Sequence, residues 1–249
     1  MHDERTQGTP QFIVPDWPAP ASVRALVTTR AGGVSRGAYR SFNLGAHVGD
    51  DPAHVRENRA RLRAALPAEP VWLEQVHGAD VVDAARAAPG TRADGAYTRA
   101  RGVICAVLTA DCLPIFLCDR AGTEVALLHA GWRGLAGGVI EQGLSALRAP
   151  PEDRLAWLGP AIGPRAYEVG DEVREAFVSR HAEAAATFAP ARTGKWYLDL
   201  YGIARQRLEA LGVRAIYGGR YCTASQPELF FSHRRDGATG RMASLIWLA

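Results

Sequence analysis

The chain has almost no lysine and no run of basic residues. Lys195 is the only lysine among 249 residues, and the arginines are scattered among acidic residues, so the formal net charge is only +3. Proteins that bind nucleic acid usually gather lysine and arginine into a patch or stripe with interleaved aromatic residues. The sequence therefore argues against a nucleic-acid partner.

Long apolar segments are also absent. No stretch approaches the roughly 18 charge-free apolar residues that a membrane-spanning helix requires. The N-terminal sequence MHDERTQGTPQF is polar and charged, and it lacks the apolar centre of a secretory signal. We therefore expect a cytoplasmic protein with no membrane partner.

Cysteine is scarce, and its pattern is not that of a disulfide framework. Cys105, Cys112 and Cys118 lie within fourteen residues on what has the pattern of one strand, and Cys222 is distant in sequence. Successive side chains of a strand point to opposite faces and cannot easily pair. In a reducing compartment a cysteine more often binds metal or reacts than forms a disulfide.

Strand and helix patterns alternate along the whole chain, without a composition shift that would mark a domain boundary. Apolar residues make up 47% of the chain and charged residues 22%, which is ordinary for a globular protein with a sizeable core. We expect strands over residues 21–30, 71–84 (broken at Gly78), 102–119, 124–130 and 215–223, a strand that runs into a glycine loop over 154–163, and two more around the turn DGATG in 228–249. We expect helices over 52–67, 139–149, 170–186 and 198–212.

This order predicts one α/β (or α+β) domain over residues 11–249, with central mixed β-sheet layers flanked by helices. Residues 1–10 read as a loose N-terminal tail. Asp51, directly before Pro52, is the expected N-cap of the helix over 52–67, since proline is favoured in a first helical turn.

Three metal-ligating residues stand in or at the end of apolar strand patterns. His77, Cys112 and His129 are each followed, directly or within two residues, by a glycine or a proline. This places them at strand ends, where sheet proteins keep binding sites. Two imidazoles and a thiolate suit catalytic zinc, which takes three protein ligands and leaves a fourth position open. Asp111 beside Cys112 would be a costly buried carboxylate unless it has a partner or a role in the site.

The residues alone leave other interpretations open. Each of the three could be a satisfied core residue. Cys112 could instead be a nucleophile, with His129 or His77 as its base and Asp111 as the group that orients the base. Copper is a third alternative, because a His₂Cys set also suits blue-copper sites.

Three polar loops are further candidates. The glycine-rich HAGWRGLAGG precedes a helix and could cradle an anion with backbone N–H groups, and its Arg133 could pair with phosphate. The segment over residues 28–51 is too long for a simple connection. Its polar side chains are Arg30, Arg36, Asn43, His47, Asp50 and Asp51. The segment SHRRDGATGRM gathers Arg234, Arg235 and Arg241 around a turn.

Taken together, the motifs resemble the laccase-domain family, whose members are variously labelled polyphenol oxidase, purine nucleoside phosphorylase and peptidoglycan-editing factor. The resemblance covers residues 22–248. It rests on TTRAGGVSRGAYRSFNLGAHVGDD, LEQVHGADVV, DGAYT, TADCLPI, HAGWRG, GPAIGPRAYEVGDEV and FFSHRRDGATGRMASLIWL, which occur in this order. His233 stands where that family usually has an aromatic residue, most often tyrosine.

The resemblance implies a fold shared with cysteine hydrolases and a Zn²⁺ ion held by His77, Cys112 and His129. It implies phosphorolysis of adenosine and inosine, cleavage of methylthioadenosine and deamination of adenosine. The expected partners are purine nucleosides and inorganic phosphate, and the protein is expected to be a monomer or a weak homodimer. Cys112 would then be a metal ligand, and Asp111 an acid that the site requires.

Phosphorolysis requires a phosphate site and groups that recognise the nucleoside. Arg133, Arg30 and Arg235 are the candidates for phosphate, and Asn43 and Gln75 could bind hydroxyl groups or base edges. Gln75 lies two residues before His77, so on a strand both would face the same side. Deamination requires an acid for the leaving amine; familiar zinc deaminases use a glutamate two residues after a ligating histidine, which neither His77 nor His129 has. Asp111 or Glu74 would have to serve.

Two other functions compete with this one. The peptidoglycan-editing label suggests a cysteine or zinc hydrolase of peptidoglycan precursors, and a purine-binding protein with little turnover is a third class. The laccase label can be tested on the histidines. Multicopper oxidases hold four coppers largely through His-x-His pairs, and this chain has seven histidines and no such pair. The sequence therefore argues against a multicopper centre.

Overall fold

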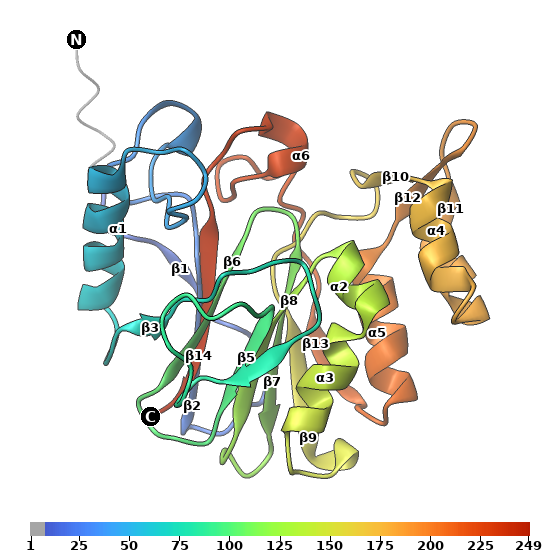
Figure 1. The fold of residues 1–249 in the computed structure, drawn as a ribbon, viewed down its shortest axis with the longest axis horizontal. Helices are drawn as coiled ribbons and strands as arrows, with labels where there is room; N and C mark the ends of the chain where they lie inside the picture. The colour runs from blue at the N-terminus through green and yellow to red at the C-terminus, as the bar shows by residue number, and fades with distance from the viewer. Residues whose placement is uncertain (1–7) are drawn as a thin grey trace.

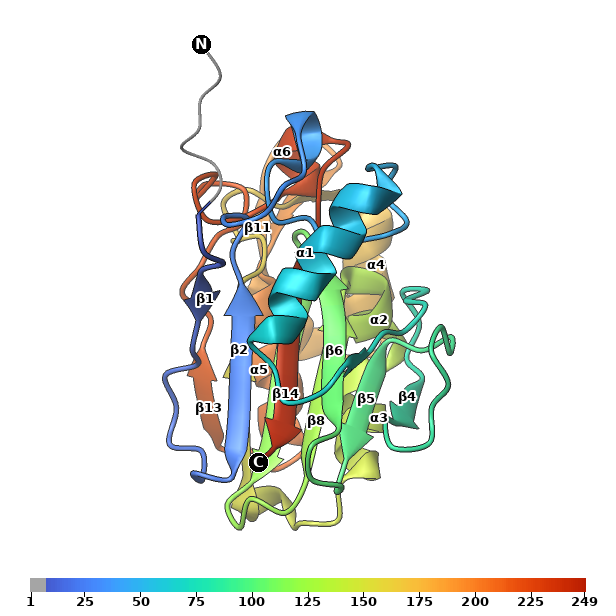
Figure 2. The same ribbon diagram turned by 90° about the vertical axis from the view of Figure 1, so that its left-hand side faces the viewer.

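Two β-sheets pack face to face, and helices cover both outer faces of this sandwich (Figures 1 and 2). The computed structural model describes residues 8–249. Residues 1–7, which make up most of the predicted loose tail, lie outside the described residues. The predicted class, a single α/β domain with mixed sheet layers flanked by helices, is confirmed.

The two large sheets have mixed strand directions. In order across the first sheet lie β1 (Phe12–Ile13), β2 (Val23–Thr28), β14 (Met242–Leu248), β6 (Ile104–Thr109) and β3 (Pro70–Val71). In order across the second lie β13 (Ala215–Gly218), β9 (Arg154–Leu158), β7 (Leu113–Asp119), β8 (Val125–Ala130), β5 (Gly95–Thr98) and β4 (Val81–Asp83). A small third sheet joins β10 (Glu168–Gly170), β12 (Lys195–Leu198) and β11 (Phe188–Pro190).

Helices cover the outer faces unequally. On the outer face of the first sheet lies α1 (Pro52–Ala64), and Figure 2 shows it in front of β2, β14 and β6. On the second sheet lie α2 (Trp132–Gly137), α3 (Val139–Ala146) and α5 (Leu200–Ala210), with α4 (Asp171–Val178) and the small sheet beyond them (Figure 1). In the described part of the chain the remaining helices are α6 (His233–Asp236) and three 3₁₀ segments, Gly37–Tyr39, Pro151–Asp153 and Ala182–Thr187. The predicted cap of α1 is confirmed, because the Asp51 carboxylate accepts a hydrogen bond from the N–H of Ala53 at 2.7 Å.

Alternating side chains fill three apolar layers. On β6, Cys105 and Val107 pack between the two sheets, whereas Ile104 and Ala106 pack under α1. On β7 the residues between the sheets include Phe116, and the opposite face packs against the helices. Both faces of the central strands are therefore buried, which explains why their sequences are continuously apolar and do not alternate with polar residues.

The prediction of one strand over residues 102–119 is wrong. The chain leaves the first sheet after Thr109 and enters the second at Leu113, so that β6 and β7 belong to different layers. Between them Asp111 has a φ of +94°, a left-handed conformation that turns the chain sharply. Because both strands are buried on both faces, hydrophobic periodicity could not reveal this break.

Three further predictions are corrected. Residues 228–249 contain one strand, β14, and not two; the part before the turn forms α6, whose Ser232 side chain accepts a hydrogen bond from the N–H of Arg235 at 3.2 Å. The strand expected over 71–84 is a loop flanked by the short β3 and β4. The helix expected over 170–186 ends at Val178 and is followed by the 3₁₀ segment Ala182–Thr187.

One edge of the sandwich gathers the ends of both sheets. Met242 of β14 pairs with Thr109 of β6, and Leu113 of β7 pairs with Ala130 of β8. Since these pairs are antiparallel, the last residues of β6 and β8 lie beside the first residues of β14 and β7. The polar loops of the chain connect at this edge, near α6 (Figure 1). Within residues 8–249 none of the helices has the length and apolar character needed to cross a bilayer.

Candidate active site

His77, Cys112 and His129 lie together at this edge. One ligand atom of each falls within 4.8 Å of those of the other two, and the two imidazole rings meet edge to face with centroids 4.8 Å apart. His77 comes from the loop before β4, Cys112 from the turn between β6 and β7, and His129 from the end of β8. Three separate elements therefore bring one cluster together.

The carboxylate of Asp94 fixes two of these residues. Its Oδ1 accepts hydrogen bonds from His129 Nδ1 at 2.7 Å and from the N–H of His77 at 2.9 Å. Its Oδ2 accepts from the N–H groups of Val76 and Gly78 at 3.1 and 2.6 Å. These bonds hold His77 in a left-handed conformation with a φ of +60°, which is uncommon for a residue with a side chain.

Asp94 is ionised although it is buried. The residue is fully buried, and burial alone would raise its pKa. The hydrogen bond from His129 and those from Gly78 and Val76 outweigh this effect, so the pKa of Asp94 is lowered. The ionised carboxylate accepts the hydrogen bond from Nδ1 of His129, so Nε2 is the ring nitrogen that can bind a metal.

Gly131 lets the three ligands approach one another. A Cβ atom at this position would lie 2.9 Å from Cys112 Sγ and 3.3 Å from His77 Cδ2. Gly131 is also the residue directly before α2, so the glycine that the sequence shows after His129 is required by the packing of the cluster.

Cys112 and His129 are electrostatically coupled. Burial alone would raise the pKa of the Cys112 thiol, but the charge and hydrogen bonds of His129 and His77 lower it well below its ordinary value. Burial would lower the pKa of His129, but the Cys112 thiolate and the Asp94 carboxylate raise it. Without a metal, the arrangement favours a thiolate beside an imidazolium; both ligands bind a metal only in their deprotonated forms.

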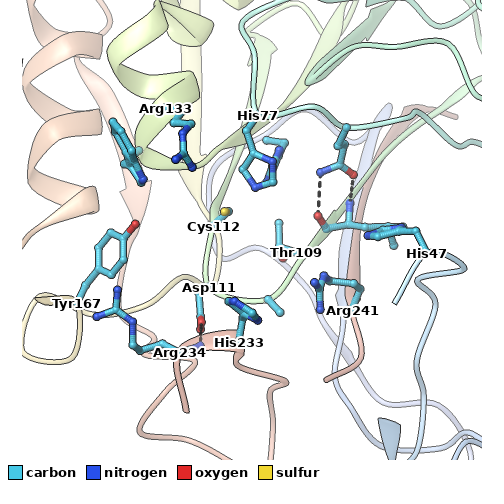
Figure 3. Close-up of a pocket in the computed structure, with 16 residues that line it drawn as sticks. His47, His77, Thr109, Asp111, Cys112, Arg133, Tyr167, His233, Arg234 and Arg241 are labelled. Atoms are coloured by element: carbon cyan, nitrogen blue, oxygen red, sulfur yellow. Dashed lines mark hydrogen bonds between the residues drawn. The ribbon is translucent and has the colours of Figure 1, made fainter. Parts of the chain in front are cut away.

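The cluster forms part of the wall of a cavity of about 360 Å³. Figure 3 shows the cavity with its lining side chains. The lining comprises His47, Gln75, His77, Leu108, Thr109, Ala110, Asp111, Cys112, His129, Gly131, Trp132, Arg133, Tyr167, His233, Arg234 and Arg241. Arginine and histidine outnumber acids in this lining, so the cavity favours an anionic ligand.

Of the predicted site residues, Asp111 lines the cavity but both of its carboxylate oxygens are engaged. Oδ1 accepts from the Thr223 hydroxyl at 2.5 Å and Oδ2 from the N–H of Arg234 at 2.7 Å. The carboxylate therefore ties the turn before β7 to two distant segments, and these partners offset the cost of burying it.

Gln75 and Arg133 also line the cavity. The Gln75 amide pairs with the backbone of Leu108, donating to its carbonyl at 2.9 Å and accepting from its N–H at 2.7 Å. Gln75 therefore extends the edge of β6. Arg133 stacks on Trp132, with its guanidinium carbon 4.6 Å from the ring centroid.

Four other predicted residues do not line the cavity. The guanidinium of Arg30 donates to the carbonyls of Arg40 and Pro227. That of Arg235 donates to the carbonyls of Thr223, Ala224 and Phe230. Asn43 is fully buried, and exposed Glu74 lies 3.8 Å from Arg92.

An aromatic wall lies on one side of the cluster. Tyr167 and Trp132 line the cavity, and Arg234 stacks on Tyr167 with its guanidinium carbon 5.0 Å from the ring centroid. Burial, followed by the charge on Cys112, raises the pKa of Tyr167 to about 12, so its phenol keeps its proton. A flat apolar surface with hydrogen-bonding groups suits a heteroaromatic ligand.

Sequence reasoning missed Asp94, Trp132 and Tyr167. Asp94 opens the motif DGAYT, and the other two lie in HAGWRG and GPAIGPRAYEVGDEV. The motifs were visible, but no spacing rule connects Asp94 with His129, which is 35 residues further along the chain. The contact exists because β5 and β8 are neighbours in the second sheet.

The donor set fits a metal ion. Two imidazoles and a thiolate within 4.8 Å of one another match a three-ligand catalytic zinc site, and the bond from Asp94 to His129 is the usual carboxylate support of a metal-binding histidine. Within residues 8–249 this is the one group of three or more such side chains close enough to hold a metal. One three-donor group does not supply the ligands of a four-copper centre.

Fold and site together define a single-domain α/β protein with a metal-type His₂Cys cluster in a cationic cavity. The family model described as "multi-copper polyphenol oxidoreductase laccase" matches residues 24–249, and the chain belongs to this family. The resemblance inferred from the motifs is thereby confirmed.

Named relatives are similar over nearly their whole length. "Purine nucleoside phosphorylase YfiH" of Shigella flexneri is 57% identical over 241 residues, which cover 96% of this chain and 99% of that protein. "Purine nucleoside phosphorylase PA4543" of Pseudomonas aeruginosa is 56% identical, covering 95% and 98%. The crystal structure of Neisseria meningitidis protein NMB0706 has a TM-score of 0.91 and 53% identity, covering 95% of this chain and 98% of that chain.

Proposed function

We propose that this protein is a zinc-dependent purine nucleoside phosphorylase that acts on adenosine, inosine and methylthioadenosine and also deaminates adenosine. The observation that carries the proposal is the His77–Cys112–His129 cluster in the wall of a cationic cavity. The names of the similar proteins from Shigella flexneri and Pseudomonas aeruginosa support it. The proposed ligands are purine nucleosides and inorganic phosphate, in the cytoplasm, where these metabolites occur.

His77, Cys112 and His129 would hold the zinc ion, with copper as the alternative metal. When bound, zinc supplies Lewis acidity and lowers the pKa of coordinated water. Asp94 holds His129 so that Nε2 faces the cluster. Trp132 and Tyr167 would bind the purine, and Tyr167 keeps its proton and can donate it in a hydrogen bond.

Deamination makes a stricter demand on the cavity, because an acid must protonate the leaving amine. Among the described lining residues the only carboxylate is Asp111, and its two oxygens are already bound by Thr223 and Arg234. Glu74 lies outside the lining. We therefore propose Asp111 as the acid that protonates the leaving amine. Because both of its oxygens are engaged, we expect deamination to be slower than phosphorolysis.

A second candidate is favoured by a specific contact. The line Asp94–His129–Cys112 has the order of an orienting acid, a base and a nucleophile, and His129 lowers the pKa of Cys112. This arrangement would serve a cysteine hydrolase acting on peptidoglycan precursors. Removing metal with a chelator would inactivate the phosphorylase but not this hydrolase, which separates the two proposals.

The test uses protein purified without a metal-chelating tag. Zinc per chain is counted, and adenosine and inosine are followed by chromatography with and without phosphate. About one zinc per chain and phosphate-dependent release of adenine and hypoxanthine support the proposal. Tight nucleoside binding with negligible turnover would indicate a purine-binding protein instead, and metal-free protein without turnover would favour the hydrolase.

Cys112→Ala should lose both zinc and activity while remaining folded, because the side chain lies at the cavity wall and not in the apolar core. Cys222→Ala is the matched control, since Cys222 is also partly exposed but does not line the cavity. Full activity of Cys112→Ala would rule out both the zinc site and the nucleophile.

A further inference from the structure

Arg241 has no acidic partner among residues 8–249. It lies directly before β14 and lines the cavity, and its Nη1 donates to the carbonyls of Thr239 and Gly240 at 2.9 and 3.0 Å. Within residues 8–249, Nε and Nη2 make no hydrogen bond and no carboxylate lies within ion-pair distance. Burial lowers the pKa of this guanidinium, as expected for a cation that has lost water. A desolvated guanidinium with free donors is suited to an anion.

Thr109 supplies a second free donor beside it. The residue is the last of β6, is only 2% exposed and lines the cavity. Its hydroxyl has no hydrogen-bond partner in the described part of the chain. The hydroxyl is not one of the fully buried side-chain atoms without a partner, so it is open to the cavity and can bind a ligand there. In Figure 3, Thr109 lies between Cys112 and Arg241.

His47 completes the group from the long loop before α1. Figure 3 shows it beside Arg241, on the side of Cys112 away from Tyr167 and Arg133. Burial and then the charge on Arg241 lower the pKa of His47, so near pH 7 it is a neutral imidazole that can donate one hydrogen bond.

Asn43 joins this loop to Arg241. Its Oδ1 accepts from the N–H of Gly45 and from the N–H of Arg241, both at 2.9 Å. Its Nδ2 donates to Asp50 at 2.9 Å. Asn43 was expected to bind substrate; its contacts make it a positioning residue that holds the segment with His47 against Arg241.

We propose that Arg241, Thr109 and His47 form the subsite for inorganic phosphate, with the purine on the opposite side of the cluster against Trp132 and Tyr167. This inference rests on the proposed function, because phosphorolysis requires phosphate and base on opposite sides of C1′ of the ribose. In this assignment Arg241, Thr109 and His47 replace Arg30 and Arg235 as the phosphate-binding residues, because the two arginines lie outside the cavity. The cavity volume of about 360 Å³ extends over both sides of the cluster.

The placement gives a balanced reaction. An oxygen of hydrogen phosphate forms a bond to C1′ while the bond from C1′ to the purine nitrogen breaks. The electron pair of that bond leaves with the purine, and the proton of hydrogen phosphate ends on the purine. The products are ribose 1-phosphate and the free base. Arg241 and Thr109 hold the nucleophile and take no proton.

The test compares Arg241→Gln and Thr109→Val with the wild type. We expect Arg241→Gln to raise the KM for phosphate, and the Kd for orthophosphate measured by calorimetry on zinc-loaded protein, by about 10- to 100-fold. The near-isosteric Thr109→Val should raise both by about 3- to 10-fold. The KM for adenosine should change by less than about twofold in either variant. General misfolding would lower the apparent kcat and would not raise the KM for phosphate alone.

Arg214→Gln is the matched control. Arg214 is exposed and directly precedes β13. Because β13 runs parallel to β9 and β9 antiparallel to β7, the start of β13 lies at the opposite edge of the sandwich from the cavity. This variant makes the same charge change and should leave both constants unchanged.

The outcomes separate the subsite from the proposed function. If the wild type cleaves adenosine only with phosphate and Arg241→Gln leaves the KM for phosphate unchanged, the subsite is wrong and the function stands. If the wild type cleaves nothing but binds orthophosphate in an Arg241-dependent way, the function is wrong and the subsite stands. Arg241-dependent binding of adenosine monophosphate without binding of orthophosphate would assign the group to a phosphate ester and overturn the inference.

Discussion

At the scale of single residues, the carboxylate of Asp94 decides how the cluster is arranged. It accepts hydrogen bonds from the ring of His129 and from the backbone of Val76, His77 and Gly78. One buried side chain therefore sets both the tautomer of one ligand and the backbone conformation of the other.

Asp94→Asn should lower zinc affinity by about 10- to 100-fold, the usual effect of removing a carboxylate that supports a metal-binding histidine. The side-chain amide of the new asparagine would also place an N–H₂ group against the backbone N–H groups that the carboxylate accepts from. The substitution should therefore lower the free energy of unfolding by about 1–3 kcal/mol. Competition with a chromophoric chelator measures the first effect and denaturant unfolding the second.

Asp80→Asn is the control, because Asp80 is an exposed aspartate in the loop that carries His77. An Asp94→Asn protein with reduced stability but wild-type zinc affinity would show that Asp94 supports the fold and not the metal site.

The sequence indicated the three clustered side chains and, around them, Asp111, Gln75 and Arg133, but it did not single out most of the other lining residues. His77, Cys112 and His129 are recognisable because metal-ligating side chains are rare in apolar strands. Asp94 carries no such signal, since an aspartate before a glycine has the pattern of an ordinary turn. Arg241 and His47 lie in the two polar loops marked as candidates, but those loops hold many polar side chains, and which of them faces inward depends on contacts between segments about 200 residues apart.

At the scale of elements, the start of α2 is packed directly against the cluster. Gly131→Ala would place a methyl group 2.9 Å from Cys112 Sγ, closer than real contacts allow. We therefore expect Gly131→Ala to lower zinc affinity at least tenfold, because Cys112 or His77 must move. Gly137→Ala in the same helix meets only a Cβ atom at 3.8 Å and should leave the affinity within about twofold, as the same chelator competition would measure. Equal affinities in the two variants would contradict the role of Cys112 as a ligand.

The turn between β7 and β8 depends on another buried aspartate, Asp119, at the end of β7 opposite to the cluster. Asp119 accepts hydrogen bonds from the N–H groups of Thr123 and Glu124 and from the Thr123 hydroxyl at 2.7–3.0 Å. Burial alone would raise the pKa of Asp119, but these bonds outweigh it and lower the pKa below its ordinary value. The stabilisation is therefore full above the pKa of an unfolded aspartate, about 3.9, and is lost as the pH falls through the folded value.

Asp119→Asn should accordingly lower the free energy of unfolding by about 1–3 kcal/mol at pH 7. The difference from wild type should shrink as the pH falls below about 4. Urea unfolding at a series of pH values measures it, and Asp16→Asn, at an exposed position, serves as control. A difference that stays constant down to pH 2.5 would show that the charge of Asp119 is not involved.

Most elements followed from local pattern, and the errors lie where contacts between distant segments decide the structure. The helices over residues 52–64 and 200–210 and the strands over 23–28 and 125–130 lie within their predicted ranges, because caps and apolar spacing mark them. The break after Thr109 was missed because buried strands carry no alternation. The strand expected before DGATG was wrong because buried Phe230 and Phe231 pack against Met242 in a loop, not in a sheet.

At the scale of the whole molecule, the metal cluster lies where the layers end. His77 and Cys112 come from connections between strands and His129 from the end of β8, whereas both sheets have their own apolar cores. Removing the metal should therefore leave the sandwich folded and only lower its stability. This distinguishes the protein from small zinc domains, which unfold without metal.

Thermal unfolding checks this expectation. At a free zinc concentration 100 times its Kd, binding to the folded state alone adds about 2.7 kcal/mol. For a chain of this length a change of 1 kcal/mol moves Tm by about 2–4 °C, so chelator-treated protein should gain about 5–10 °C on adding zinc. Cys112→Ala should gain less than about 2 °C, because two imidazoles alone bind zinc far more weakly. Loss of cooperative unfolding in the chelated wild type would instead show that the metal holds the two sheets together, which their continuous apolar interface argues against.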